Sequence, residues 1–289
     1  MIENHKFNKK FGQNFISDKN LLAAIVNDAQ ISSNDEVLEI GAGGGALTQE
    51  LATKAKKVVS YEIDKTLTEH LNELSKQFDN LEIIIDDALK LPIQEIEQNF
   101  EGEYKLVANL PYYITSPLIF KFLEQTKRCK SITVMVQQEV AQRFCAKAGD
   151  ENYGIPSVML NFYCDCKIMR NVSRKMFFPM PNVDSAVIRL DRKEIPYSDE
   201  FISKFSKIVN SSFAMRRKTL INNLTKNLKV SKEEILKILK NLNLSEMVRA
   251  EELTIEDYKN LTQQLNFYFI NWQKFKHNIY YYWEKFDGK

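Results

Sequence analysis

Short apolar runs alternate with stretches of helical periodicity along the first half of the chain. Apolar residues recur at helical spacing over 21–30, 47–54 and 67–74. The apolar runs predict strands at 36–40, 58–63, 81–85, 105–109 and 131–136. Because strands and helices alternate, we expect an α/β fold with a mostly parallel sheet covered on both faces.

The pattern changes towards the C-terminus. Residues 153–169 and 185–190 are expected to be further strands, and their closeness in sequence favours an antiparallel pair. Beyond Pro196, residues 201–224 and 232–242 have the amphipathic pattern of helices, and no strand signal follows. The chain is therefore divided into an α/β domain, a small helical domain and an aromatic-rich extension, over 1–193, 194–265 and 266–289.

Length and composition indicate a globular protein without a membrane span. The chain has 289 residues, of which 44% are hydrophobic and 27% charged, enough for one large and one small domain. No apolar run approaches the ~20 residues that cross a bilayer. The N-terminal sequence MIENHKFNKKFGQNF lacks the apolar core of a signal peptide. We expect a cytoplasmic protein.

Charge and cysteine content restrict the choice of partners only weakly. The net charge is +2, which neither favours nor excludes nucleic acid. Basic residues do cluster, and several clusters on one face could follow a phosphate backbone. The clusters lie at 9–10, 127–130, 170–175 and 216–218. Cys164 and Cys166 have no second pair near them, so no metal site is expected.

The first strand runs into a glycine-rich turn, Gly41-Ala-Gly-Gly-Gly45, and helical spacing resumes after it. Glycines let a backbone approach a bound nucleotide closely. Gly41, Gly43 and Ala46 fit the loose form of the dinucleotide fingerprint. The turn also reads Glu39-x-Gly41-x-Gly43-x-Gly45, a pattern typical of S-adenosylmethionine methyltransferases. The turn therefore favours S-adenosylmethionine, with a dinucleotide as the alternative.

Carboxylates follow the next two strands. Glu62 stands at the end of the second strand, where its two acceptor oxygens can take both ribose hydroxyls of either cofactor. Asp86-Asp87-Ala88 follows the third strand. One of these carboxylates can accept from the adenine amine of the cofactor. Asp87, next to Ala88, is the predicted acceptor, and Asp86 is expected to be exposed or to cap the turn.

Asn109-Leu110-Pro111-Tyr112 follows the fourth strand and indicates the reaction. Ligands of an open α/β sheet bind outside the carboxyl ends of the strands. The side-chain oxygen of Asn109 and the carbonyl of Leu110 can accept from the two N–H bonds of an adenine amine, which frees the nitrogen lone pair. Pro111 stiffens the turn, and Tyr112 offers a stacking face worth roughly 1–3 kcal/mol. These residue types predict methyl transfer to that amine without a basic catalyst.

A second aromatic segment, Phe177-Phe178-Pro179-Met180-Pro181, is stiffened by proline. A phenylalanine here can stack on the other face of an extruded base and offset the cost of extrusion. Phe178 is the residue predicted for this role. The alternative is a hydrophobic plug between two strands.

Taken together, the motifs resemble the ribosomal RNA adenine dimethyltransferases, and most closely the bacterial small-subunit (kasugamycin-resistance) branch. The resemblance covers residues 10–265. It rests on six motifs in order: Phe11-Gly-Gln-Asn-Phe-Ile16, Glu39-Ile-Gly-Ala-Gly43, Asn109-Leu-Pro-Tyr112, Phe178-Pro-Met-Pro-Asn-Val-Asp-Ser-Ala186, Arg216-Arg-Lys-Thr-Leu220 and Val248-Arg-Ala-Glu-Glu252.

The resemblance implies a Rossmann-like catalytic domain, a helical RNA-binding domain and S-adenosylmethionine as methyl donor, with no metal. It implies dimethylation at N6 of two adjacent adenines near the 3′ end of 16S rRNA during small-subunit biogenesis, by a monomer. The implied cofactor contacts are Asn14, Ile16, Gly41, Gly43, Glu62, Asp87, Ala88 and Asn109. The implied catalytic and RNA-binding residues are Asn109, Leu110, Pro111, Tyr112 and Phe178, and Arg216, Arg217 and Lys218.

Three alternatives stay open. The chain could be a large-subunit methyltransferase of the macrolide-resistance type, a dinucleotide oxidoreductase or a non-catalytic RNA-binding assembly factor. Relatives of mitochondrial transcription factors share the expected fold. The family does not account for the extension at 266–289, which we expect to be a helix on the apolar face of the small domain. RNA stacking by its aromatic residues is the alternative, and a role at a membrane surface is a weaker one.

Overall fold

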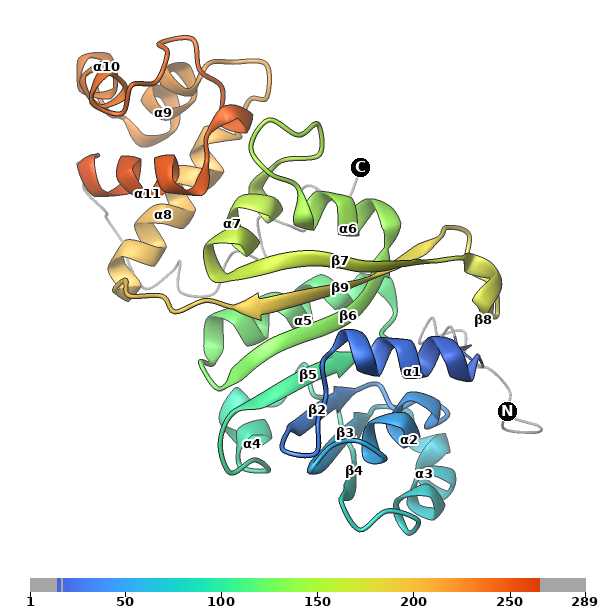
Figure 1. The fold of residues 1–289 in the computed structure, drawn as a ribbon. Helices are drawn as coiled ribbons and strands as arrows, with labels where there is room; N and C mark the ends of the chain where they lie inside the picture. The colour runs from blue at the N-terminus through green and yellow to red at the C-terminus, as the bar shows by residue number, and fades with distance from the viewer. Residues whose placement is uncertain (1–14, 17, 266–289) are drawn as a thin grey trace. The chain divides into compact units, whose positions relative to one another are not determined.

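The computed structural model describes residues 15–16 and 18–265 (Figure 1). The chain divides into two compact units. The first comprises residues 1–141 and 165–192, and the second comprises residues 142–164 and 193–289. Residues 142–164 of the second unit thus lie, in sequence, between the two segments of the first unit. The predicted domain limits at 193 and 265 remain predictions, and the extension at 266–289 lies outside the described residues.

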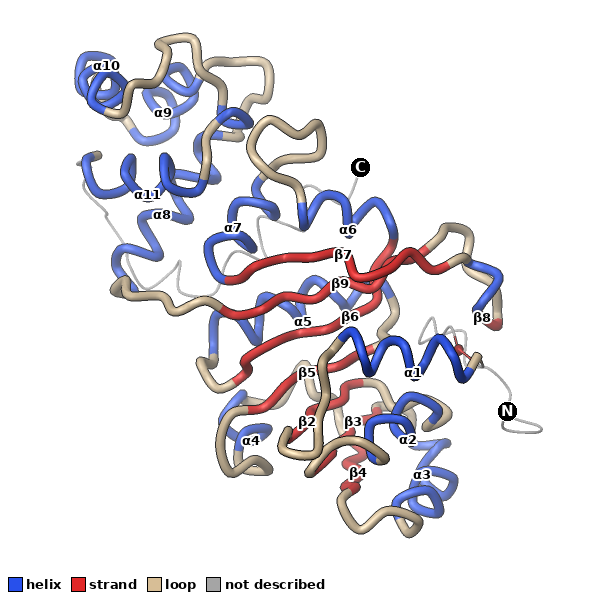
Figure 2. Tube along the Cα trace, in the orientation of Figure 1, coloured by secondary structure: helices blue, strands red, loops and turns tan. Residues whose placement is uncertain are grey.

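A seven-stranded sheet forms the centre of the first unit, in the order β4-β3-β2-β5-β6-β9-β7 (Figure 2). The pairs from β4 to β6 are parallel, and β9 is antiparallel to β6. The strands are β2 (Glu36–Ile40), β3 (Lys57–Glu62), β4 (Leu81–Ile85), β5 (Tyr104–Ala108), β6 (Cys129–Gln137), β7 (Cys164–Val172) and β9 (Ser185–Arg192). The chain moves outward from β2 to β4 and returns to pair β5 with β2. Such a reversal leaves a crevice at the carboxyl ends of the strands.

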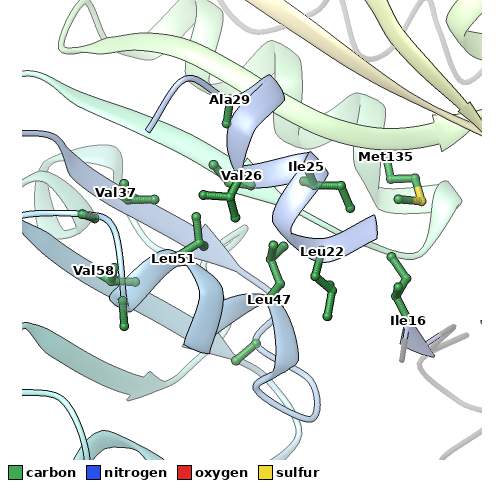
Figure 3. Close-up of a cluster of buried hydrophobic side chains, with 14 of the residues drawn as sticks. Ile16, Leu22, Ile25, Val26, Ala29, Val37, Leu47, Leu51, Val58 and Met135 are labelled. Atoms are coloured by element: carbon green, nitrogen blue, oxygen red, sulfur yellow. The ribbon is translucent and has the colours of Figure 1, made fainter. Parts of the chain in front are cut away.

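The helices of the first unit bury apolar faces against this sheet. Asp18 caps α1, because its carboxylate accepts from the amide of Leu21 at 2.9 Å. Side chains of α1, α2 and strands β2 and β3 form one buried cluster (Figure 3). Each leucine or isoleucine buried there contributes roughly 1.5–3 kcal/mol. The helices are α1 (Lys19–Asp28), α2 (Ala46–Ala52), α3 (Thr68–Ser75), α4 (Ile93–Glu97) and α5 (Tyr112–Gln125), with a 3-10 turn η2 (Lys65–Leu67) before α3. Helix α6 (Gln138–Cys145) begins in the first unit and ends in the second.

A separate two-stranded sheet joins the two ends of the first unit. β1 (Phe15–Ile16) pairs antiparallel with β8 (Phe177–Phe178), which follows the 3-10 turn η3 (Arg174–Met176). The register places Phe15 opposite Phe178 and Ile16 opposite Phe177. Ile16 and Phe177 are both buried. The segment that carries Phe178 is thereby held beside the start of the described chain.

The second unit is helical. Its helices are α7 (Ile155–Tyr163), α8 (Asp199–Ser212), α9 (Leu220–Leu228), α10 (Lys232–Asn241) and α11 (Ile255–Gln264), with the 3-10 turn η4 (Ala250–Glu252). Aromatic rings fill its core: Phe162 stacks on Phe205 with centroids 4.3 Å apart. Tyr258 is fully buried and donates its hydroxyl to the carbonyl of Ala250 at 2.9 Å. A serine or threonine hydroxyl caps the N-terminus of each of α8, α9, α10 and α11. These residues are Ser198, Thr219, Ser231 and Thr254.

The α/β pattern of the first half is confirmed, with strand ends within two residues of the prediction. The expected strand at 153–169 is wrong over most of its length, because residues 155–163 form α7 and β7 begins only at Cys164. Residues 155–163 are mostly apolar, and periodicity alone does not separate a buried helix from a buried strand in so short an apolar run. Pro156 lies in the first turn of α7, where its missing N–H costs nothing.

The expected helix at 201–224 is also wrong in part, because it is interrupted between α8 and α9. Thr219 starts the second helix by accepting from the amide of Asn222. In the part of the chain that the structure describes, no helix has both the length and the apolar character that a membrane span requires.

Candidate cofactor and substrate site

A cavity of about 620 Å³ lies at the carboxyl ends of β2, β3, β4 and β5. Its walls are the loops that leave these four strands, together with residues of β1 and β8. This is the crevice where the strand order reverses. The predicted residues that line it are Ile16, Gly41, Gly43, Glu62, Asp87, Ala88, Asn109, Leu110, Pro111 and Phe178.

The glycine turn after β2 depends on glycine for two reasons. Gly41, Gly43 and Gly45 have φ angles of 84°, 55° and 77°, which are unfavourable for other residues. A Cβ at Gly41 would lie 2.8 Å from Cδ2 of Leu110, and a Cβ at Gly43 would lie 3.2 Å from the ring of Phe15. The turn is therefore in close contact both with the Asn109–Tyr112 segment and with β1.

Glu62 is 3% exposed and holds the glycine turn from β3. Its Oε2 accepts from the amide of Gly43 at 2.7 Å, and its Oε1 accepts from the amide of Asp64 at 2.8 Å. A carboxylate has about four acceptor positions, so each oxygen keeps capacity for one more donor. Glu62 is thus rigidly oriented at the cavity wall and suited to accept ribose hydroxyls.

Glu39 supports the turn from behind and does not line the cavity. It is fully buried, and its Oε2 accepts from the hydroxyls of Thr48 and Ser60, both at 2.6 Å. Burial raises the pKa of Glu39 to about 7; the two hydroxyls oppose this, and the charge of Glu62 adds to it. Glu39 therefore ties β2 to α2 and β3.

The loop after β4 carries Asp86, Asp87 and Ala88. Asp87 accepts from the amide of Leu89 at 3.1 Å through Oδ1 and pairs with Nζ of Lys90 at 3.1 Å through Oδ2. Asp86 is exposed and caps the loop by accepting from the amide of Asp87 at 2.7 Å. Both carboxylates border the cavity, so the choice of Asp87 for the adenine amine stays a prediction.

The Asn109–Tyr112 segment contributes three of its four residues to the cavity wall. Tyr112 is not among the lining residues. It begins α5, and its hydroxyl hydrogen-bonds to Oγ of Ser185 at 2.7 Å. Burial raises the pKa of the Tyr112 hydroxyl. The next residue, Tyr113, does line the cavity and is 64% exposed.

Phe178 lies at the mouth of the cavity and is 60% exposed. Its exposed ring is therefore placed where a ligand in the cavity could stack on it. Sequence reasoning did not assign three other aromatic lining residues, Phe15, Tyr61 and Tyr113, to the site. Tyr113 could have been noticed as the second aromatic of Tyr112-Tyr113, and Phe15 as the residue between Asn14 and Ile16 in the first motif, although its contact with Gly43 comes only from the fold.

The remaining predicted residues lie elsewhere. Asn14 lies outside the described residues. Arg216, Arg217 and Lys218 are exposed on the loop between α8 and α9 in the second unit. Among the described residues, no group of three or more His, Cys, Asp or Glu side chains is arranged to hold a metal ion.

Comparisons with known proteins identify the family of the chain. The family model described as ribosomal RNA adenine dimethylase matches residues 4–266. A relative from Clostridioides difficile, named ribosomal RNA small subunit methyltransferase A, is 43% identical over 268 residues, covering 91% of this chain and 92% of the relative. A relative of the same name from Caldanaerobacter subterraneus is 45% identical over 265 residues, covering 90% and 97%.

Solved structures give the same result. A crystal structure of a dimethyladenosine transferase from Plasmodium falciparum has a TM-score of 0.73 and 30% identity, covering 86% of this chain and 96% of that chain. The 23S rRNA methyltransferase ErmE has a TM-score of 0.71 and 27% identity, covering 87% and 99%. The Rossmann-like methyltransferase fold and the resemblance found in the sequence motifs are thus confirmed. The chain belongs to the ribosomal RNA adenine dimethylase family and is an rRNA methyltransferase.

Proposed function

We propose that the protein uses S-adenosylmethionine to dimethylate the N6 amines of two adjacent adenines near the 3′ end of 16S rRNA, as a monomer acting on the small ribosomal subunit in the cytoplasm. The name shared by relatives at 43–45% identity supports the small-subunit substrate. The observation that carries the proposal is that the glycine turn, Glu62 and Asn109 line the same cavity.

The cavity suits S-adenosylmethionine in its chemistry. Glu62 offers acceptors for ribose hydroxyls, and Asp87 with Ala88 would hold the adenine ring. Substituting Gly41 or Gly43 would fill the space close to the turn. In this assignment Ile16, which lines the cavity, contacts the cofactor; a contact from Asn14, outside the described residues, stays a prediction. When bound, S-adenosylmethionine supplies an electrophilic methyl carbon.

The target adenine would be held by the Asn109–Tyr112 segment and Phe178. The side-chain oxygen of Asn109 and the carbonyl of Leu110 accept from the amine, which leaves the nitrogen lone pair available. Phe178 stacks on the extruded base from the mouth of the cavity, and Tyr112, which follows the lining residue Pro111 but does not itself line the cavity, is the residue proposed for the opposite face. Rate then comes from orientation and from exclusion of water. The proton released by the amine goes to solvent.

The test is transfer of labelled methyl groups to small subunits purified from cells that lack this modification. Nucleoside analysis should place the label in N6,N6-dimethyladenosine of 16S rRNA. Asn109→Ala should lower the rate by about 100-fold or more, as does loss of a preorganised polar group in other active sites, while subunit binding is retained. Unchanged transfer by Asn109→Ala would contradict the role of that side chain.

One alternative substrate has a specific observation in its favour. ErmE, a 23S rRNA methyltransferase, matches this chain over 87% of its length with a TM-score of 0.71. The same assay separates the two substrates, because a large-subunit enzyme would label 23S rRNA. A non-catalytic assembly factor would bind subunits and transfer no label.

A further inference from the structure

Lys121 reaches from α5 to the loop that carries Asp87 and Ala88. Its Nζ donates to the carbonyl oxygens of Ala88 at 2.8 Å, Leu89 at 2.9 Å and Leu91 at 2.5 Å. An ammonium group has three N–H donors and no acceptor, so the loop engages all of them. Lys121 is not among the residues that line the cavity. It therefore acts on the loop from behind.

The loop needs this partner. The amides of Lys90 and Leu91 both donate to the carbonyl of Asp87, at 2.9 and 3.3 Å. No backbone amide in the described part of the chain donates to the carbonyls of residues 88, 89 and 91. Carbonyls left open in this way must find another donor or water. The Lys121 ammonium satisfies all three and thereby fixes the course of the loop.

Lys121 and Lys90 both contact the loop, but Lys121 is more buried and bonds to carbonyls instead of a carboxylate. Lys121 is half-buried, and this burial lowers the pKa of its ammonium, while the charge of Asp87 raises it. Hydrogen bonds from a charged donor are stronger than neutral ones. Lys90, by contrast, pairs with Asp87 from a side chain that is 83% exposed. An exposed ion pair contributes little, so Lys90 provides a matched control for charge without the carbonyl contacts.

We propose that Lys121 is a positioning residue for the adenine end of the cofactor. It preorganises the loop so that Asp87 and Ala88 need not be ordered when the ligand binds, which strengthens binding. The proposal rests on the assignment of this loop to the adenine of S-adenosylmethionine. Since α5 begins at Tyr112, the same helix also carries the end of the segment that is proposed to hold the target base.

The experiment measures binding of S-adenosylhomocysteine and of 5′-methylthioadenosine, which lacks the amino-acid part, by calorimetry. Lys121→Met should raise the Kd for both ligands by about tenfold or more, the loss expected when bonds from a charged group are removed. Both ligands should lose the same factor, because both contain the adenine. In steady-state methyl transfer, KM for S-adenosylmethionine should rise while kcat changes little. Lys90→Met should leave both Kd values nearly unchanged.

Lys121→Arg keeps the charge, but the guanidinium spreads its donors over three nitrogens in one plane and cannot place them where the single Nζ atom lies, so we expect a partial loss. This variant carries the test if Lys121→Met fails to fold, as judged by thermal unfolding without ligand. Normal binding of both ligands by a folded Lys121→Met or, in its place, by Lys121→Arg would overturn the proposal, as would an equal loss in Lys90→Met. Asp87→Ala separates the two levels of inference. If Asp87→Ala and the Lys121 variant both bind the two ligands normally, the assignment of this loop to the cofactor is wrong. If Asp87→Ala weakens binding and the Lys121 variant does not, only the role of Lys121 is wrong.

Discussion

The hydroxyl of Tyr112 lies 2.7 Å from Oγ of Ser185. This hydrogen bond joins the first residue of α5 to the first residue of β9. Ser185 is fully buried and follows the loop that carries Phe178. The two aromatic residues proposed to enclose the target base therefore belong to segments that one hydrogen bond links. The bond fixes the rotation of the Tyr112 ring.

Removal of this bond should slow methyl transfer without abolishing it. A hydrogen bond of this kind contributes about 1 kcal/mol, so Tyr112→Phe and Ser185→Ala should each lower the single-turnover rate by roughly fivefold. The double variant should be no slower than either single variant, because only one bond is removed. Single-turnover methyl transfer to unmethylated small subunits measures all three rates. Multiplicative effects in the double variant would show that the two residues act separately.

Glu62 offers a second test, because both of its oxygens accept from backbone amides. Glu62→Gln replaces one oxygen by an NH2 group, which must then face the amide of Gly43 or of Asp64. A donor facing a donor loses a charge-assisted bond worth about 1.5–3 kcal/mol. We expect the Kd for S-adenosylhomocysteine to rise by roughly ten- to a hundredfold. Glu69→Gln, on α3 and outside the cavity lining, is the control and should bind normally.

The buried carboxyl of Glu39 predicts a pH dependence of stability. Its pKa is raised in the folded protein to about 7 from an ordinary value of 4.5. Between these values the unfolded chain loses this proton while the folded protein keeps it, so the contribution of Glu39 to stability falls as pH rises from 4.5 to 7. The fall should be on the order of 1–3 kcal/mol.

Urea unfolding at several pH values compares the wild type with Glu39→Gln, which imitates the protonated carboxyl. The free energy of unfolding of the wild type should decrease relative to that of Glu39→Gln between pH 5 and pH 7, and the difference should then level off. A constant difference across this range would mean that Glu39 does not titrate there. Burial also raises the pKa of Glu124 to about 7. Because Glu124 is present in both proteins, its contribution cancels in the difference between their free energies of unfolding.

Much of this site was predictable because it is local in sequence. The glycine turn, Glu62 and the Asn109–Tyr112 segment each follow a strand, and parallel strands bring their carboxyl ends together. Lys121 and Ser185 were missed, because their partners lie far away in sequence and no periodicity marks such pairs. Tyr112 was expected at the base, and its bond to Ser185 could not be foreseen for the same reason.

The glycine turn gives a prediction that contrasts three glycines. Gly41→Ala places a Cβ at positive φ and 2.8 Å from Leu110. Gly43→Ala has the same backbone problem but a looser contact, 3.2 Å from the ring of Phe15. Each should cost about 1–2 kcal/mol of stability from the backbone alone, with Gly41→Ala the worse for methyl transfer because Leu110 must move. Gly102→Ala, with nothing within 4 Å, is the control.

Urea unfolding and the rate of methyl transfer check this order. Gly102→Ala should change neither quantity appreciably. If Gly41→Ala is as active as the wild type, close contact between the turn and Leu110 is not needed for the reaction.

The basic loop of the second unit carries the last prediction, which concerns RNA binding. Asn223 is 1% exposed and holds this loop by donating to the carbonyls of Ser212 at 2.7 Å and Met215 at 3.1 Å, while its Oδ1 accepts from the amide of Met215 at 3.1 Å. The exposed residues that follow, 216–218, are all basic. A buried amide that satisfies three backbone groups makes the loop a fixed platform for these charges.

Replacing Arg216, Arg217 and Lys218 by alanine should weaken binding to the small subunit. A plot of log K against log salt has a negative slope. In the variant this slope should become less steep by about 0.7–0.9 for every phosphate contact that is lost. Alanine at Lys237 and Lys240, exposed on α10, removes charge from the same unit and should have the smaller effect. Asn223→Ala keeps every charge, so weaker binding with an unchanged salt slope would show that the shape of the loop matters. Equal losses of affinity in the α10 control would mean that net charge, and not this loop, attracts the RNA.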